Sequence, residues 1–121
     1  MAGQLMTVAE TLPFLRQATS LWSEAEHYDF VDYIAANPDA GDVIPDTGGL
    51  RKLRWSRAGM GKRGGTRVIY FYFDPTMPLY LLRVYAKAQQ ENLTHDEKRQ
   101  LRALGSALRR AHRSGQHEQV R

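Results

Sequence analysis

The sequence predicts an α+β fold in which an N-terminal helix pair and a C-terminal helix pack on an antiparallel β-sheet. Three observations predict it. Apolar side chains recur at helical spacing over residues 12–36, a period of two over residues 50–57 and 79–87 flanks the β-branched and aromatic run 66–73, and the helical period returns over residues 94–111. Elements of one kind are therefore grouped along the chain, which is typical of α+β proteins rather than of alternating α/β proteins.

Length and composition favour one globular domain. The chain has 121 residues, of which 42% are hydrophobic and 25% charged, and these values argue against a mostly disordered protein. We expect a single domain over residues 1–113 and a polar, loose tail over residues 114–121. The absence of cysteine excludes disulfides, thiolate nucleophiles and cysteine-based zinc sites.

The sequence gives no sign of export or of a membrane-spanning helix. The longest strongly apolar stretches, residues 68–73 and 77–82, are far shorter than the roughly 20 residues that a membrane-spanning helix needs. The N-terminal sequence MAGQ lacks the basic and apolar segments of a secretory signal. We therefore expect a cytoplasmic protein with no membrane partner.

A short strand and a helix open the chain. Residues 7–10 are expected to form the strand, and Thr11 is placed to cap the helix that follows. Pro13 falls in the first turn of this helix, where proline is tolerated. The apolar residues at helical spacing are Leu12, Leu15 and Trp22.

A second helix follows directly. Ser23 and Glu26 have the spacing of a capping box, and the helix is expected to run to about Ala36. Asn37 and Pro38 end it, because a residue before proline avoids the helical conformation. The stripe that should face the sheet consists of Tyr28, Val31, Ile34 and Ala35.

The sheet is predicted to be a meander of three strands that follows a loop over residues 38–49. The strands and their connections are residues 50–57, a glycine-rich connection over 58–65, residues 66–73, a turn over 74–78, and residues 79–87. Residues 66–73 are largely apolar on both faces, which predicts a central strand.

The last helix begins after Thr94, which forms a second capping box with Glu97. Its apolar stripe is Leu101, Leu104, Leu108 and Ala111. The order of elements is therefore two helices, a meander and one more helix.

Alternation along the strands gathers basic side chains on one face of the sheet. If Leu53 and Trp55 face the helices, the same choice places Val68, Tyr70, Tyr72, Leu82 and Val84 beside them. The other face then carries Lys52, Arg54, Arg67, Arg83, Tyr85 and Lys87. Protection of sheet edges explains Lys52 and Arg54, but it explains poorly the cations of central strands, where like charges opposite each other repel. We therefore expect an anion-binding site on this open face.

Charge is divided unevenly along the chain. Residues 1–50 hold one basic and eight acidic residues, a net charge of −7, whereas residues 51–121 hold 16 basic and five acidic residues, a net charge of +11. Such a division favours two electrostatically different surfaces, and the basic one suits nucleic acid, although both can be solvated faces without a partner.

Other motifs do not point to a cofactor or a metal. Residues 59–64 match the glycine pattern of a dinucleotide-binding loop, but a strand follows them where that motif requires a helix. The four histidines do not gather near the basic strands, so neither a metal site nor a histidine-based ribonuclease is expected. Lys62 and Arg63 in the connection are instead suited to contact a phosphate backbone.

The central block of the sequence resembles the RelE/HigB-like toxins of bacterial type II toxin–antitoxin systems. The resemblance rests on GDVIPDTGGLRKLRW at residues 41–55 and GKRGGTRVIYF at residues 61–71, and it continues in LLRVYAK at 81–87 and ENLT at 91–94. It extends over about residues 5–110. The family implies a microbial-ribonuclease type of fold with helices on an antiparallel sheet.

The resemblance also implies an activity. Such toxins are endoribonucleases that cleave translated mRNA in the ribosomal A site and are neutralised by a cognate antitoxin. Lys52 and Arg54 match the basic pair before the hairpin, Arg67 matches the arginine of the following strand, and Lys87 matches the basic residue that ends the last strand. These four are the expected catalytic residues, without a metal or cofactor.

A second set of residues is expected to contact RNA or the ribosome: Arg51, Arg57, Lys62, Arg63, Arg83 and Tyr85. Some members carry an arginine and a tyrosine just beyond the lysine, but here Ala88, Gln89 and Gln90 follow it. Tyr85 and Glu91 are the candidates for a general acid or base. Two other functions stay open, a nucleic-acid-binding protein without activity and a degenerate toxin that only binds its antitoxin.

Overall fold

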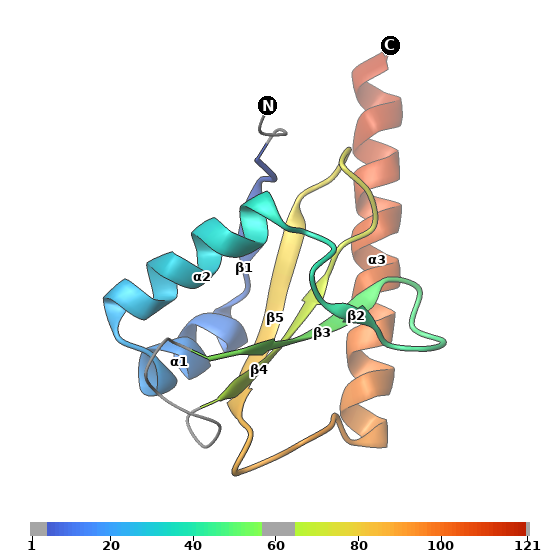
Figure 1. The fold of residues 1–121 in the computed structure, drawn as a ribbon. Coiled ribbons are helices and arrows are strands. Elements are labelled where there is room, and N and C mark those ends of the chain that lie inside the picture. The colour runs from blue at the N-terminus through green and yellow to red at the C-terminus, as the bar shows by residue number, and fades with distance from the viewer. Residues whose placement is uncertain (1–4, 57–64, 121) are drawn as a thin grey trace.

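The computed structural model describes residues 5–56 and 65–120 and is an α+β protein with three helices and one mixed sheet of five strands. The elements in chain order are β1 (Val8–Glu10), α1 (Leu12–Leu21), α2 (Glu24–Ala36), β2 (Asp42–Val43), β3 (Leu50–Trp55), β4 (Thr66–Phe71), β5 (Leu79–Ala86) and α3 (His95–Val120). The order of strands in the sheet is β1-β5-β4-β3-β2, with β4 in the middle (Figure 1). The predicted α+β class is therefore confirmed.

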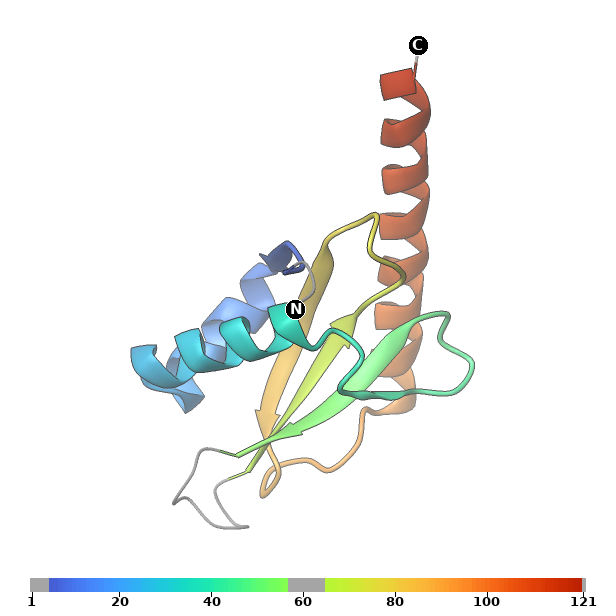
Figure 2. The ribbon, with the colours of Figure 1, turned by 45° about the horizontal axis from the view of Figure 1, so that its top comes forward.

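The sheet lies between the helices. The pair α1–α2 covers one face and α3 lies against the other, as two views of the ribbon show (Figures 1 and 2). Each face has its own apolar cluster. Phe14, Phe30 and Ile34 pack with Tyr70 and Leu81 on the side of the helix pair. On the side of α3, the cluster contains Leu50, Ile69, Phe71, Leu82 and Leu101.

The helix starts are those that the sequence predicts. Thr11 accepts a hydrogen bond from the Phe14 amide and caps α1. Both bonds of the capping box between Ser23 and Glu26 are present at the start of α2. A carboxylate oxygen of Glu97 accepts from the Thr94 amide at 2.9 Å, and the Thr94 hydroxyl accepts from the Glu97 amide at 3.1 Å.

The buried stripe of α2 differs from the prediction at one position. Tyr28 is 61% exposed, whereas Phe30 is fully buried against the rings of Trp22 and Trp55. Ile34 and Ala35 are buried as predicted. The helix is oriented so that the purely apolar ring of Phe30 enters the core, and Tyr28 keeps its hydroxyl in solvent.

The sheet differs from the predicted meander in two respects. β1 pairs with β5 in parallel, so the sheet is mixed rather than wholly antiparallel. The short strand β2 forms within the expected loop and pairs antiparallel with β3. The prediction that β4 is central is confirmed, because all six of its residues are buried.

A β-bulge changes the parity of β5. The register shifts between Ile69, which pairs with Arg83, and Tyr70, which pairs with Leu81, so that Leu82 has no partner on β4. Leu82 therefore packs on the side of α3, and the expectation that it lies under the helix pair is wrong. Leu81 lies on the side of the helix pair in its place.

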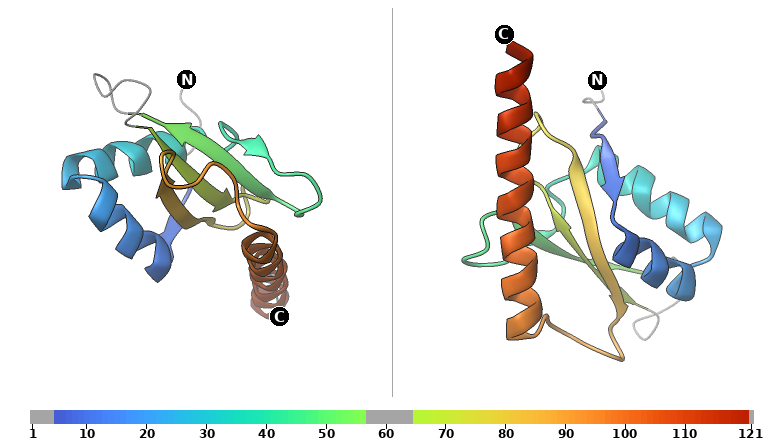
Figure 3. Two further views of the ribbon diagram at one scale, coloured as in Figure 1. Left: turned by 90° about the horizontal axis from the view of Figure 1, so that it is seen from below. Right: turned by 180° about the vertical axis from the view of Figure 1, so that it is seen from behind.

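Helix α3 is longer than expected and extends well past the sheet (Figure 3, right). It continues to Val120, so residues 114–120 are helical where we expected a loose tail. This segment contains no proline and several good helix formers, which allows the helix to continue. Among the described residues, no helix combines the length and apolar character needed to cross a membrane.

Candidate active site

The strand registers place the predicted basic residues on one face. Lys52 pairs with Ile69, Arg54 with Arg67, and Arg67 with Tyr85, and directly paired residues point to the same side of a sheet. This is the side of α3, whose Leu101 packs in one cluster with Ile69, Phe71 and Tyr85. We call Lys52, Arg54, Arg67, Arg83 and Lys87 the cationic face.

Arg67 lies at the centre of the cationic face and is buried. Its side chain is 4% exposed, and Nη2 donates to the carboxylate oxygens of Glu91 at 3.2 and 3.3 Å. Arg54 stands directly opposite on β3. Because like charges opposite each other on neighbouring strands destabilise a sheet, Glu91 supplies the negative charge that this arrangement needs.

Glu91 belongs to the segment between β5 and α3, which is tied to the sheet at further points. The Lys52 ammonium donates to the Asn92 side-chain oxygen at 2.6 Å, and the Tyr85 hydroxyl lies 3.5 Å from the Glu91 carbonyl oxygen. Viewed from below, the segment passes across this end of the sheet on its way to α3 (Figure 3, left). Beside it lies a cavity of about 220 Å³, lined by Ile44, Lys52, Asn92, Leu93 and Lys98.

The surrounding cations perturb the titration of the site. The hydrogen bond from Arg67 holds the pKa of the Glu91 carboxyl below its usual range, and the charges of Lys87 and Arg54 add to this effect, whereas desolvation opposes it. Burial raises the pKa of the Tyr85 hydroxyl, and the negative charge of Glu97 acts in the same direction. The site therefore presents an ionised carboxylate among cations at neutral pH.

The structure does not bring every expected residue to this site. Arg51 points to the opposite side of β3, where Nη1 donates to the carbonyl oxygens of Gly41 at 2.7 Å and Asp39 at 3.2 Å. Arg83 is on the cationic face, and its Nη1 donates to the Leu82 carbonyl oxygen at 2.7 Å. Three expected contacts lie outside the described residues: Arg57, Lys62 and Arg63.

Glu91 and Asn92 are the features of the site that alternation could not place. The resemblance makes Glu91 only a candidate acid or base, and no pattern in the sequence indicates a role for Asn92. Both follow the last strand, where the period of two ends and the chain turns at residues 87–89. An acidic residue shortly after a run of basic strand residues in the sequence indicates an ion pair with one of them, because buried cations need a counter-charge.

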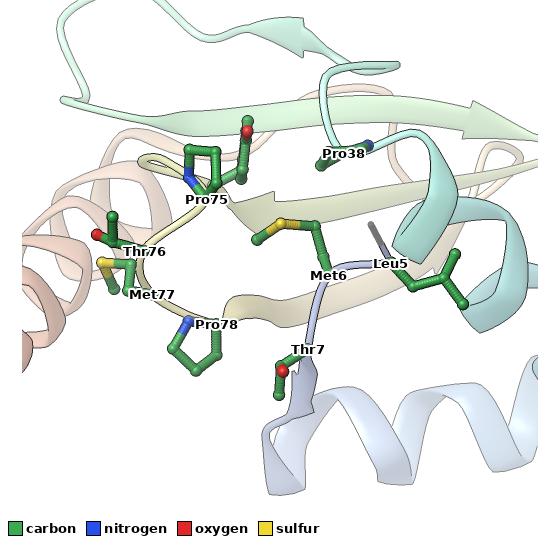
Figure 4. A pocket seen from close by; sticks show the side chains of 9 residues that line it. Leu5, Met6, Thr7, Pro38, Pro75, Thr76, Met77 and Pro78 are labelled. Atoms are coloured by element: carbon green, nitrogen blue, oxygen red, sulfur yellow. The ribbon is translucent and has the colours of Figure 1, made fainter. Parts of the chain in front are cut away.

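A larger cavity lies at the other end of the sheet and lacks the chemistry of the cationic face. It has a volume of about 650 Å³ and is formed by the N-terminal segment, Pro38 and the turn between β4 and β5 (Figure 4). No charged side chain lines it. Among the side chains that the structure describes, those of residues 5–56 and 65–114, no three histidine or carboxylate groups gather to hold a metal ion.

Comparison with known proteins gives two findings. The family described as "RelE toxin of RelE / RelB toxin-antitoxin system" matches residues 35–120, which include the whole cationic face. Among solved structures, the chain is similar to an arginine-to-alanine double mutant of the E. coli toxin RelE in the free state. The TM-score is 0.53 at 14% identity, and the match covers 73% of this chain and 90% of that one. At this identity the likeness concerns the fold.

Proposed function

The chain belongs to the RelE family of toxins of toxin–antitoxin systems, and we propose that it is an endoribonuclease that cleaves mRNA on the ribosome. The observation that carries the proposal is the clustering of cations from β3, β4 and the end of β5 on one face of the sheet. Arg54 and Lys87 are exposed there, and Lys52 is half-buried. Positive charge at this density suits the phosphate backbone of a nucleic acid better than a small neutral substrate.

The proposed reaction is a transesterification within the RNA. The 2′-hydroxyl attacks the adjacent phosphorus, the 5′-oxygen leaves, and a 2′,3′-cyclic phosphate forms. Such a reaction needs the ribose and phosphate held in line and the developing negative charge neutralised. Lys52, Arg54 and Lys87 are proposed to supply that charge from side chains.

The ribosome is the proposed source of substrate orientation. Arg54 and Lys87 are exposed, and exposed cations bind RNA backbone without fixing one phosphodiester in line. Translating ribosomes hold mRNA in a defined frame and conformation. A toxin with this face is therefore expected to cut ribosome-bound mRNA far faster than free RNA.

The experiment that tests the proposal maps mRNA 5′ ends in a translating extract after addition of the purified protein. We expect cuts in phase with codons, which disappear when ribosomes are removed. A protein with Lys52→Ala and Arg54→Ala should lose the cuts, whereas one with Arg110→Ala and Arg113→Ala on the exposed side of α3 should retain them. Protection of mRNA without cuts would favour a non-enzymatic RNA-binding protein.

A further inference from the structure

We infer that Glu91 is a catalytic residue of the proposed reaction: its carboxylate takes the proton from the attacking 2′-hydroxyl, and Arg67 is the positioning residue beneath it. The inference rests on the proposed function. It gives the basic cluster a partly exposed carboxylate that can accept a proton.

The first argument is that Arg67 is already occupied. Nη2 donates to both oxygens of Glu91, and only 4% of the Arg67 side chain is exposed. A phosphate cannot take the same positions while Glu91 holds them. The family resemblance makes Arg67 an expected catalytic residue, but the geometry points to a residue that acts through Glu91.

The second argument is that Glu91 faces the substrate side. Its side chain is 46% exposed, more than a purely structural partner of a buried arginine requires. The neighbouring carboxylate, Glu97, is engaged differently, since its Oε1 accepts from both the Thr94 amide and the Gln90 side chain. Glu97 caps α3, whereas the exposed part of Glu91 is open to a ligand.

The third argument is that Glu91 is held in place before any substrate binds. Arg67 fixes its carboxylate, the Tyr85 hydroxyl lies 3.5 Å from its carbonyl oxygen, and Lys52 holds the next residue, Asn92, at 2.6 Å. Arg54 and Lys87 complete the surroundings and act electrostatically on the same carboxylate. A phosphate bound by these two exposed cations would therefore lie beside Glu91.

The step balances without a further reactant. Glu91 takes the proton of the 2′-hydroxyl while the 2′-oxygen bonds to phosphorus. The bond from phosphorus to the 5′-oxygen breaks, its electron pair leaves with that oxygen, and water supplies the proton that the oxygen needs. Glu91 then returns its proton to solvent. The surrounding cations keep this carboxylate in the ionised, proton-accepting form at neutral pH, and they make it a weaker base than an unperturbed carboxylate.

The test measures single-turnover cleavage of mRNA on saturating ribosomes. Glu91→Gln should slow cleavage by about 100-fold or more, the range in which general bases contribute, while ribosome affinity stays near that of the wild type. Asp96→Asn is the matched control, because it makes the same change at an exposed carboxylate of α3 that is paired with Arg99. The control should cleave at the wild-type rate.

Two further measurements keep the result decisive. Glu91→Asp retains the charge beside Arg67 and should fold, but it draws the carboxylate back by about one bond length, a displacement that can cost about 100-fold. A second substrate carries sulfur in place of the scissile 5′-oxygen, a leaving group that needs no proton. Glu91→Gln should stay slow on it, because attack still lacks its base.

The outcomes separate this inference from the proposed function. Wild-type rates in both Glu91 variants would make Glu91 a counter-ion only and overturn the inference, while the proposed function stands. Recovery of Glu91→Gln on the sulfur substrate would make the residue a general acid and also overturn it. A wild-type protein that cuts no mRNA would overturn the proposed function and the inference together.

Discussion

At the scale of single residues, the burial of Arg67 sets the character of the site. A guanidinium in the middle of a sheet is costly unless hydrogen bonds and a counter-charge compensate for lost water. Glu91 provides both, although it lies 24 positions away in the sequence. A substitution at Glu91 therefore affects the stability of the fold as well as the site, because it removes the counter-charge of buried Arg67.

This link makes a prediction about pH. The pKa of Glu91 is lower in the folded protein than in the unfolded chain, where it is about 4.3. Ionised Glu91 therefore stabilises the fold at pH values above the unfolded-state pKa. This stabilisation is lost as the pH falls through the lower folded-state pKa. Glu91→Gln should therefore be less stable than the wild type at pH 7. The difference should shrink below pH ~4, where protonated Glu91 resembles the amide. Urea unfolding of both proteins across this range checks it, and a constant difference would contradict it.

A second residue-scale prediction concerns Tyr70, which ties β4 to the connection after α2. Its buried hydroxyl donates to the Pro38 carbonyl oxygen and accepts from the Gly41 amide, both at 2.8 Å. Tyr70→Phe leaves these two backbone groups without their partner and should lower the free energy of unfolding by about 1–3 kcal/mol. Tyr28→Phe at an exposed position should change it by less than about 0.5 kcal/mol. Equal effects in urea unfolding would refute the argument.

Sequence alternation could predict part of the site and not the rest. It placed Lys52, Arg54 and Arg67 on one face because their strands keep a strict period of two through this region. It could not predict that Arg67 is buried, because that depends on Glu91. The position of Glu91 follows from how an irregular segment folds over the sheet, for which the sequence offers no period.

At the scale of elements, the sequence predicted all three helices and the three long strands. The failures occur where local pattern carries little information. Three residues of β1 do not indicate whether it runs parallel or antiparallel to β5, because its direction is set by how α1 and α2 connect to the rest. The bulge at Leu82 lies within an apolar run, so either side of the sheet could accept that residue.

The contact between α3 and the sheet gives an element-scale prediction. Phe71 is wedged between two glycines, since a Cβ at Gly105 would lie 2.9 Å from its Cε1 atom and one at Gly49 would lie 2.7 Å from the same atom. Alanine normally stabilises a helix by about 1 kcal/mol over glycine, but overpacking costs about 1–3 kcal/mol. Gly105→Ala should therefore destabilise the protein by about 1 kcal/mol.

The neighbouring position provides the control for this prediction. Ser106 is exposed on the same helix, so Ser106→Ala should leave stability unchanged or raise it slightly. Thermal and urea unfolding of the two variants separate close packing from helix propensity. A stabilised Gly105→Ala protein would show that the Phe71 ring can move and that α3 packs loosely against the sheet.

At the scale of the whole molecule, the uneven distribution of charge along the sequence corresponds to two differently charged sides of the sheet. The acidic N-terminal half contributes the helix pair on one side of the sheet, whereas the basic half contributes the cationic face and α3. The family pairs each toxin with an antitoxin, and the two sides offer such a partner different chemistry. RNA is repelled by the acidic side, which favours approach to the cationic face.

The final prediction tests whether the proposed binding to the ribosome depends on local phosphate contacts or on the net charge of the protein. Each phosphate contact contributes about 0.7 to 0.9 to the slope of log affinity against log salt concentration. If Lys52 and Arg54 each contact a phosphate, replacing both with glutamine should reduce the slope by about 1.4 to 1.8.

Arg110→Gln with Arg113→Gln removes the same charge from the exposed side of α3. Because exposed charges beyond about 10 Å are largely screened at 0.1 M salt, this control should leave the slope almost unchanged. Binding is measured with ribosomes carrying mRNA that lacks the 2′-hydroxyl at the cut site, so that cleavage does not interfere. Equal reductions in both variants would mean that net charge, rather than the cationic face, governs association.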